Sequence, residues 1–253
     1  MRRPFIAGNW KMNLSQDECR SLASEIASEL AGPADCDVAV CPPFVYLETV
    51  LNAVAGSSVK VGAQNLYPEP SGAFTGEISA SMLSDLGVSY AILGHSERRH
   101  ILGETDAQVF SKLQAALASG LSPIVCVGET LEQREAGQTN EVVSSQFHGS
   151  IAQLSEEDFA QVTIAYEPVW AIGTGKVATP EQAEEVHSNL RNVIESRYNT
   201  SIAAAVRIQY GGSVKPDNVA QLMAQENIDG ALVGGAALSP ESFLGIVHGA
   251  VGQ

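Results

Sequence analysis

Eight short apolar segments recur along the chain, and each is followed by a polar turn and then by a stretch with the period of a helix. Within most segments the apolar residues are continuous, and only residues 59–62 and 206–210 alternate with charged or polar ones. This pattern is typical of strands that are buried on both faces of a parallel sheet. The segments are residues 5–8, 38–41, 59–62, 91–94, 124–128, 162–166, 206–210 and 231–234. Eight such units in 253 residues predict an α/β fold in which eight parallel strands close into a (β/α)₈ barrel with surrounding helices.

The helical stretches begin with recognisable capping residues. Ser15 is followed by Glu18 in the spacing of a capping box, and Thr179 and Ser239 each stand directly before a proline. No linker rich in Pro, Gly or Ser and no shift in composition divides the chain. We therefore expect a single catalytic domain over residues 1–253. The runner-up fold is an open doubly wound sheet, for which such even strand spacing is less expected.

The net charge of the chain limits the kinds of molecule that it is expected to bind. The chain has 14 basic and 29 acidic residues, giving a formal net charge of −15. This charge repels nucleic acid and anionic lipid, so neither a nucleic acid nor a membrane surface is an expected partner. A small phosphorylated molecule is still possible, because it needs only a few backbone N–H donors and one lysine.

Cysteine and histidine usage gives no sign of a metal site or a disulfide framework. The four cysteines, Cys19, Cys36, Cys41 and Cys126, are scattered, so we interpret them as reduced thiols in the core. We expect no metal and no cofactor. The start of the chain does not resemble a signal peptide, and no apolar run is long enough for a membrane span, so we expect a cytoplasmic protein. Four histidines are predicted to lie at the surface: His100, His148, His187 and His248.

Chemically useful side chains follow the predicted strands, at the carboxyl ends where barrel enzymes build their active sites. Asn9 and Lys11 end the first strand and could together bind a phosphate and polarise an oxygen, although a lone lysine is more often a solvated surface residue. His95 ends the fourth strand just before a helical turn, whose dipole disfavours a positive ring. A neutral imidazole there could donate a proton. A hydrogen-bonded structural histidine is the alternative.

Glu167 ends the sixth strand and precedes Pro168 and an apolar, glycine-rich loop. Burial against Trp170 or Ile172 would raise the pKa of the carboxylate, as a general base requires. A salt-bridged glutamate at a strand end is the alternative. In the loop over residues 168–178, residues 172–178 resemble a dinucleotide fingerprint only superficially, because the helix begins past the glycines, at Thr179. We interpret this loop as a mobile lid.

Two glycine pairs follow the seventh and eighth strands. Residues 210–214 read YGGSV, and residues 234–236 read GGA. Their exposed backbone amides, in the two loops between which barrels often seat a phosphate, predict a phosphate site. A tight turn would explain one pair but less easily both.

These segments together resemble the triosephosphate isomerase family, which folds as a TIM barrel. The resemblance includes GNWKMN at residues 8–13, GHSERR at 94–99 and an unbroken AYEPVWAIGTG at 165–175. It is completed by YGGSV at 210–214 and LVGGA at 232–236, so that it runs from the first strand to the last. We see no departure at a catalytic position.

The resemblance also implies a role for each matching residue. Glu167 would be the base, His95 the electrophile, Lys11 the charge stabiliser and Asn9 a supporting hydrogen-bond donor. Backbone amides of Gly173, Ser213, Gly234 and Gly235 would hold the phosphate of the substrate. The supporting and lid residues would be Glu97, Cys126, Pro168, Trp170, Ile172, Tyr210 and Leu232, with Ile172 and Leu232 clamping the base.

The implied reaction is the cofactor-free interconversion of dihydroxyacetone phosphate and D-glyceraldehyde 3-phosphate through an enediolate, a step of glycolysis and gluconeogenesis. The alternatives are another sugar-phosphate isomerase and a non-catalytic barrel that binds sugar phosphates. The lid and the presence of base, electrophile and lysine argue against both. The resemblance further implies a homodimer, formed through the loop that begins at Gln64 and ends at Glu77.

Overall fold

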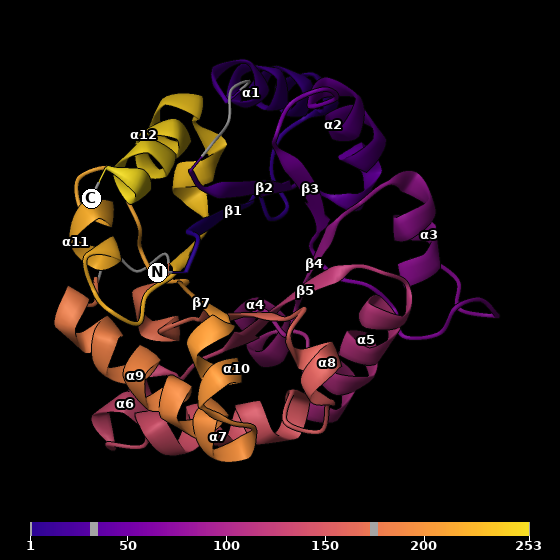
Figure 1. The fold of residues 1–253 in the computed structure, drawn as a ribbon. Coiled ribbons are helices and arrows are strands. Elements are labelled where there is room, and N and C mark those ends of the chain that lie inside the picture. Colours follow the sequence, from indigo (N-terminus) through magenta and orange to yellow (C-terminus); the bar gives the residue numbers. More distant parts are fainter. Residues whose placement is uncertain (1, 31–34, 173–176, 253) are drawn as a thin grey trace.

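The computed structural model describes residues 2–30, 35–172 and 177–252. Its eight parallel strands pair in chain order and close into a barrel, and the helices form a ring outside it (Figure 1). The strands are β1 (Phe5–Asn9), β2 (Asp37–Cys41), β3 (Lys60–Ala63), β4 (Tyr90–Leu93), β5 (Ser122–Val127), β6 (Thr163–Tyr166), β7 (Arg207–Tyr210) and β8 (Gly230–Val233). Each overlaps one predicted segment. The predicted (β/α)₈ barrel is confirmed, and the doubly wound alternative is wrong, because β1 also pairs with β8.

The helices include short turns that the sequence pattern did not separate. They are α1 (Gln16–Glu29), α2 (Leu47–Ala53), α3 (Ala80–Leu86), α4 (Ser96–His100), α5 (Asp106–Ala118), α6 (Leu131–Glu135), α7 (Thr139–Ser150), α8 (Glu156–Phe159), α9 (Pro180–Arg197), α10 (Thr200–Ala205), α11 (Val219–Met223) and α12 (Pro240–Val251). Three short 3₁₀ helices are η1 (Phe44–Tyr46), η2 (Val169–Ala171) and η3 (Gly235–Leu238). The expected caps form: Ser15, Thr179 and Ser239 each accept a hydrogen bond from an amide of the first turn.

Alternation along the strands divides the core into two layers. Side chains such as Phe5 and Ala7 fill the barrel interior, while the intervening Ile6 packs outward into the layer under the helices. All four cysteines are buried and free, as expected from the sequence. Within the described residues, no helix is long and apolar enough to cross a membrane.

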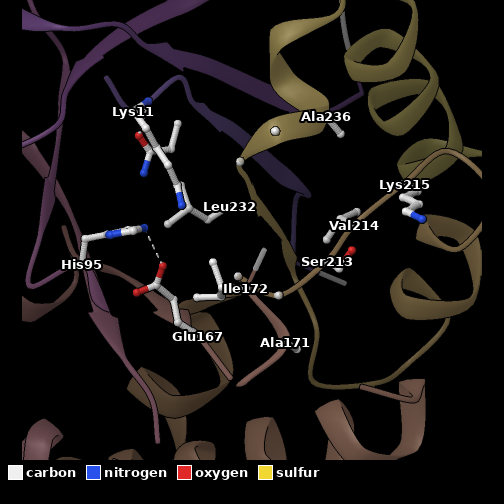
Figure 2. Close-up of a pocket in the computed structure, with 15 residues that line it drawn as sticks. Lys11, His95, Glu167, Ala171, Ile172, Ser213, Val214, Lys215, Leu232 and Ala236 are labelled. Carbon is white, nitrogen blue, oxygen red and sulfur yellow. Dashed lines mark hydrogen bonds and ion pairs between the residues drawn. The ribbon is translucent and has the colours of Figure 1, made fainter. Parts of the chain in front are cut away.

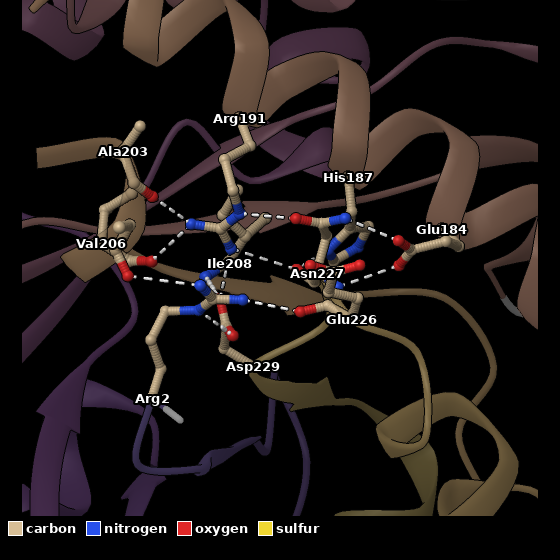
Figure 3. Close-up of polar contacts among 11 residues, drawn as sticks. Arg2, Glu184, His187, Arg191, Ala203, Val206, Ile208, Glu226, Asn227 and Asp229 are labelled. Carbon is tan, nitrogen blue, oxygen red and sulfur yellow. Dashed lines mark hydrogen bonds and ion pairs between the residues drawn. The ribbon is translucent and has the colours of Figure 1, made fainter. Parts of the chain in front are cut away.

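A polar network lies at the amino-terminal end of the barrel, next to β7 and β8 (Figure 3). The Asp229 carboxylate accepts hydrogen bonds from the side chains of Arg2 and Arg191 and from the Ile208 amide, at 2.7 Å and 2.8 Å for the last two. β7 and β8 share a single registered pair, between Tyr210 and Ala231. The network therefore supplies polar contacts where the strand ladder is shortest.

The structure of this region contradicts the prediction made for His187. His187 on α9 is fully buried, with Nδ1 3.2 Å from the carbonyl oxygen of Asn227, so its predicted surface position is wrong. The other three histidines predicted to be exposed, His100, His148 and His248, are exposed. His187 differs because it lies on the same face of α9 as Ala183 and Leu190, which packs against the barrel.

Candidate active site

A cavity of about 260 Å³ lies at the carboxyl ends of the strands. Segments that follow β1, β4, β6, β7 and β8 contribute to its wall, as a site at this end of a barrel requires (Figure 2). The lining residues are Asn9, Lys11, His95, Glu167, Ala171, Ile172, Gly211, Gly212, Ser213, Val214, Lys215, Leu232, Gly234, Gly235 and Ala236. The structure thus brings together the candidate residues that are far apart in sequence.

Glu167 comes directly after β6 and is 2% exposed. Its Oε1 lies 2.9 Å from Nε2 of His95, and its Oε2 accepts a hydrogen bond of 2.8 Å from the Ser96 amide. Figure 2 shows the His95 ring and the Glu167 carboxylate pointing toward each other across the cavity. Both carboxylate oxygens are therefore engaged by protein donors in this structure.

These donors decide the direction in which the pKa of Glu167 moves. Burial raises it, but the contacts with His95, the Ser96 amide and the charge of Lys11 together lower it further than burial raises it. The expectation of a raised pKa is therefore wrong for this arrangement. The Trp170 ring nitrogen bonds to Glu129, while Ile172 lines the cavity together with Glu167.

His95 caps the first turn of α4, as the sequence indicated. Its Nδ1 accepts a hydrogen bond of 3.2 Å from the Glu97 amide, so the ring hydrogen lies on Nε2, which faces Glu167. Burial lowers the pKa of His95, but the Glu167 carboxylate raises it by more. The helical turn thus fixes the tautomer, while Glu167 sets the direction of the pKa shift.

Lys11 is held over the cavity by its backbone and its side chain. Its backbone is left-handed (φ 52°), which is strained for a residue with a side chain. Asn9 Oδ1 accepts a hydrogen bond of 3.0 Å from the Lys11 amide, and Gln64 donates one of 2.8 Å to the Lys11 carbonyl. Lys11 Nζ lies 2.6 Å from the Glu97 carboxylate. These contacts place the ammonium group near His95.

The surroundings of Glu167 are closely packed. Ile172 and Leu232 line the cavity beside it, as the resemblance implied. Cys126 is fully buried, and the neighbouring Glu167 carboxylate adds to the effect of burial in raising the pKa of its thiol. A Cβ at Gly211 would come within 2.8 Å of Glu167 Cγ, so only glycine leaves room for the carboxylate there.

The start of the predicted lid is anchored to Glu129, a fully buried residue. Its Oε1 accepts hydrogen bonds from Trp170 Nε1 at 2.9 Å and from the Tyr166 hydroxyl at 3.1 Å. Pro168 is buried, and η2 follows it. Gly173 and the rest of residues 173–176 lie outside the described residues.

The opposite side of the cavity carries the expected glycine-rich segments. Ser213, Gly234 and Gly235 line it, and η3 begins at Gly235, where the first amides of a helical turn lack internal partners. Tyr210 lies behind them, and a Cβ at Gly212 would stand 2.2 Å from its hydroxyl oxygen. Within the described chain, no three His, Cys, Asp or Glu side chains group in a way that could hold a metal ion.

Three supporting residues escaped the sequence reasoning. Ser96 acts through its backbone amide, which no side-chain pattern reveals, and Gln64 was noted only as the start of a loop. Glu129 had a possible signal, since it follows the apolar fifth strand and has no nearby basic residue until Arg134. A carboxylate at that position is expected at the mouth of the barrel.

Comparison with known proteins agrees with this geometry. The sequence model of the triosephosphate isomerase family matches residues 4–250. A triosephosphate isomerase of Rhodopirellula baltica is 55% identical over 249 residues, which cover 98% of each chain. Enzymes of the same name from Chloroflexus aurantiacus and Clostridium botulinum are 54% and 53% identical, over 98% of this chain and 99% and 100% of theirs.

The match spans all eight strands and every segment that lines the cavity. Fold, site and full-length similarity lead to one conclusion. The chain belongs to the triosephosphate isomerase family.

Proposed function

We propose that this protein interconverts dihydroxyacetone phosphate and D-glyceraldehyde 3-phosphate by proton transfer between adjacent carbons. The observation that carries the proposal is the Glu167–His95 contact of 2.9 Å in a cavity whose opposite side offers Ser213, Gly234 and Gly235. A base and a proton donor thus stand at one end, and amides suited to a phosphate at the other. The phosphate would then place the carbon chain between Glu167 and His95.

In the proposed mechanism, Glu167 removes a proton from C1 of dihydroxyacetone phosphate. Negative charge develops on the C2 oxygen, where the Nε2–H of His95 and the ammonium of Lys11 stabilise it. His95 passes its Nε2 proton to the C2 oxygen and recovers a proton from the C1 hydroxyl. The protonated Glu167 returns its proton to C2, which yields the aldehyde. Asn9 supports Lys11 through its amide contact.

Substrate must replace Glu167 as the partner of His95, because both need the same Nε2–H. Once Glu167 gives up His95 and the Ser96 amide, burial remains and raises its pKa, which makes it a stronger base. For His95, the same change removes the largest contribution that raises its pKa, so burial and Lys11 favour a neutral ring. Substrate binding would therefore raise the pKa of Glu167 and lower the pKa of His95.

The test replaces Glu167 by glutamine, which keeps the shape and removes the base. We expect turnover of the triose phosphates to fall by about 10²- to 10⁴-fold, with inhibition by inorganic phosphate unchanged. Exposed Glu241 on α12 provides the matched control, since Glu241→Gln makes the same chemical change outside the cavity. Equal turnover in Glu167→Gln and wild type would remove Glu167 from the role of base.

A homodimer is part of the proposal. The segment from Gln64 to Glu77 protrudes beyond the helix ring between β3 and α3 (Figure 1). It is ordered by its own contacts, including rings of Tyr67 and Phe74 whose centroids lie 4.7 Å apart. Exposed apolar side chains recur in the first part of the chain, namely Met12, Val45, Phe74, Met82, Leu86, Ile101 and Leu102. Such a surface is typical of a protein interface.

We also propose that one catalytic domain, residues 1–253, carries the activity, and that it acts in the cytoplasm. The strands that form the cavity run from residue 5 to residue 233, which supports one domain. Four unpaired thiols are compatible with a reducing compartment.

A further inference from the structure

Lys215 lies at the edge of the cavity, one residue past Val214 and two past Ser213. Figure 2 shows it beyond Ser213, on the side of the cavity away from the His95–Glu167 pair. The turn that carries it is fixed by Asn218, which accepts a hydrogen bond from the Lys215 amide at 2.8 Å and donates one to the Ser213 carbonyl at 3.1 Å. Its position beside the expected phosphate end is therefore set by the backbone.

Lys215 differs in its charge environment from the other charged residues that line the cavity. The protein has a net charge of −15, which opposes the approach of a phosphate dianion. Glu167 lines the same cavity, and the ammonium of Lys11 is paired with Glu97 at 2.6 Å. Lys215 is exposed, and its ammonium group forms no hydrogen bond or ion pair with any described residue. Among the described lining residues it is the cation whose charge is not offset by a carboxylate contact.

We propose that Lys215 attracts the phosphate dianion of the substrate to the Ser213 end of the cavity and thereby lowers KM, without a part in the proton transfer. This inference rests on the proposed function, because it assumes a phosphorylated substrate. The lysine acts equally on the ground state and the transition state, since the phosphate keeps its charge throughout the reaction. Such uniform binding changes KM and leaves kcat unchanged.

The expected size follows from Coulomb attraction across water. One positive charge about 10 Å from a dianion changes binding about threefold at ~0.01 M ionic strength and less than twofold at ~0.15 M. Lys215→Gln should therefore raise KM about threefold at low salt, and the difference from wild type should shrink as salt is added. The inhibition constant of inorganic phosphate should rise in parallel.

Three controls separate the effect of charge from a structural effect. Lys60 is exposed at the first residue of β3, at the opposite end of the barrel, so Lys60→Gln makes the same change in net charge away from the cavity. The slow isomerisation of glyceraldehyde, which lacks the phosphate, should be the same in Lys215→Gln as in wild type. Lys215→Arg should retain the wild-type KM and its salt dependence.

Asp217 offers a test of opposite sign. It is exposed two residues past Lys215 but does not line the cavity. Removal of its charge in Asp217→Asn should lower KM slightly at low salt, because the local potential becomes more positive.

The outcomes are distinct. A KM for Lys215→Gln equal to that of wild type at low salt would overturn the inference. It would also be overturned by a loss that persists at high salt or extends equally to glyceraldehyde, since both indicate a structural defect. If wild type itself fails to interconvert the triose phosphates, the proposed function fails instead.

Discussion

The Glu167 carboxylate has two hydrogen bonds in the free protein, so its strength as a base depends on which of them substrate removes. His95 and the Ser96 amide hold one oxygen each, at 2.9 Å and 2.8 Å. Burial alone would raise the pKa, and these partners reverse the direction. The reactivity of a buried carboxylate is therefore a property of its changing partners as well as of its position in the chain.

His187 links the stability of the fold to pH. Burial is the main reason that its pKa is lowered to about 3, well below the ordinary value of 6.5. Because the unfolded chain binds this proton more readily, the contribution of neutral His187 is complete above pH 6.5 and is lost as pH falls toward 3. We expect this residue to account for about 2 kcal/mol of lost unfolding free energy between pH 7.5 and 5.0.

The measurement is urea unfolding of wild type and His187→Gln at both pH values, at one fixed protein concentration. The variant should start less stable but lose about 2 kcal/mol less over this interval. Identical losses in the two proteins would mean that His187 does not carry the pH dependence.

For single residues, the sequence predicted which candidate side chains lie close together but not which hydrogen-bond partners they have. Asn9 ends a strand, Lys11, His95 and Glu167 each follow one, and the barrel brings strand ends together. The Ser96 amide could not be predicted, since it depends on backbone geometry. The burial of His187 was predictable, because it lies four residues after Ala183 and three before Leu190, on the apolar face of α9.

Among the elements, the strands were predictable and the short helices were not. A buried parallel strand has a continuous apolar run, which a four-residue segment such as β6 already displays. A helix shows its period only over several turns, so α6 and α8 left no readable pattern. The cap of α9 was recognisable because Thr179, Pro180 and Gln182 act locally.

The β7–β8 junction depends on side chains as well as on its strand ladder. Arg191 on α9 reaches across it, with Nη2 2.7 Å from Asp229 and Nε 2.8 Å from the Asn227 side chain (Figure 3). Its side chain is 11% exposed, and that of Asp229 is 4% exposed. Removing Arg191 leaves Asp229 with Arg2 and the Ile208 amide as partners. It is still costly, because little solvent reaches Asp229 and the carbonyl oxygens of Ala203 and Val206 lose the same donor.

We therefore expect Arg191→Met to lower the unfolding free energy by about 3–5 kcal/mol. Arg207→Met serves as the control, since Arg207 pairs with Asp37 in a more exposed position and should cost about 1 kcal/mol or less. Urea unfolding at pH 7.5 measures both. Equal losses of unfolding free energy in the two variants would show that the network around Asp229 contributes no more to stability than the more exposed pair.

For the whole molecule, the proposed dimer would link assembly to catalysis. Met12 is 94% exposed and directly follows Lys11, whose backbone is strained. Ile101 is 76% exposed and directly follows α4, the helix that His95 caps. An interface over these side chains would therefore hold the two segments that position the ammonium and imidazole groups. Sequence periodicity could not reveal this surface, because such exposed residues belong to no buried face.

The last prediction tests this link with Ile101→Glu. A charge in place of an exposed apolar side chain leaves the folded monomer intact but opposes burial against a second copy, where it would have to be desolvated. We expect light scattering at micromolar concentration to give the mass of a dimer for wild type and of a monomer for the variant. Turnover should fall with dissociation, because the segments after β1 and β4 lose their support.

Val251→Glu, at the end of α12, is the matched control and should remain dimeric and active. A monomeric Ile101→Glu variant with full activity would separate assembly from catalysis, and a dimeric one would place the interface elsewhere.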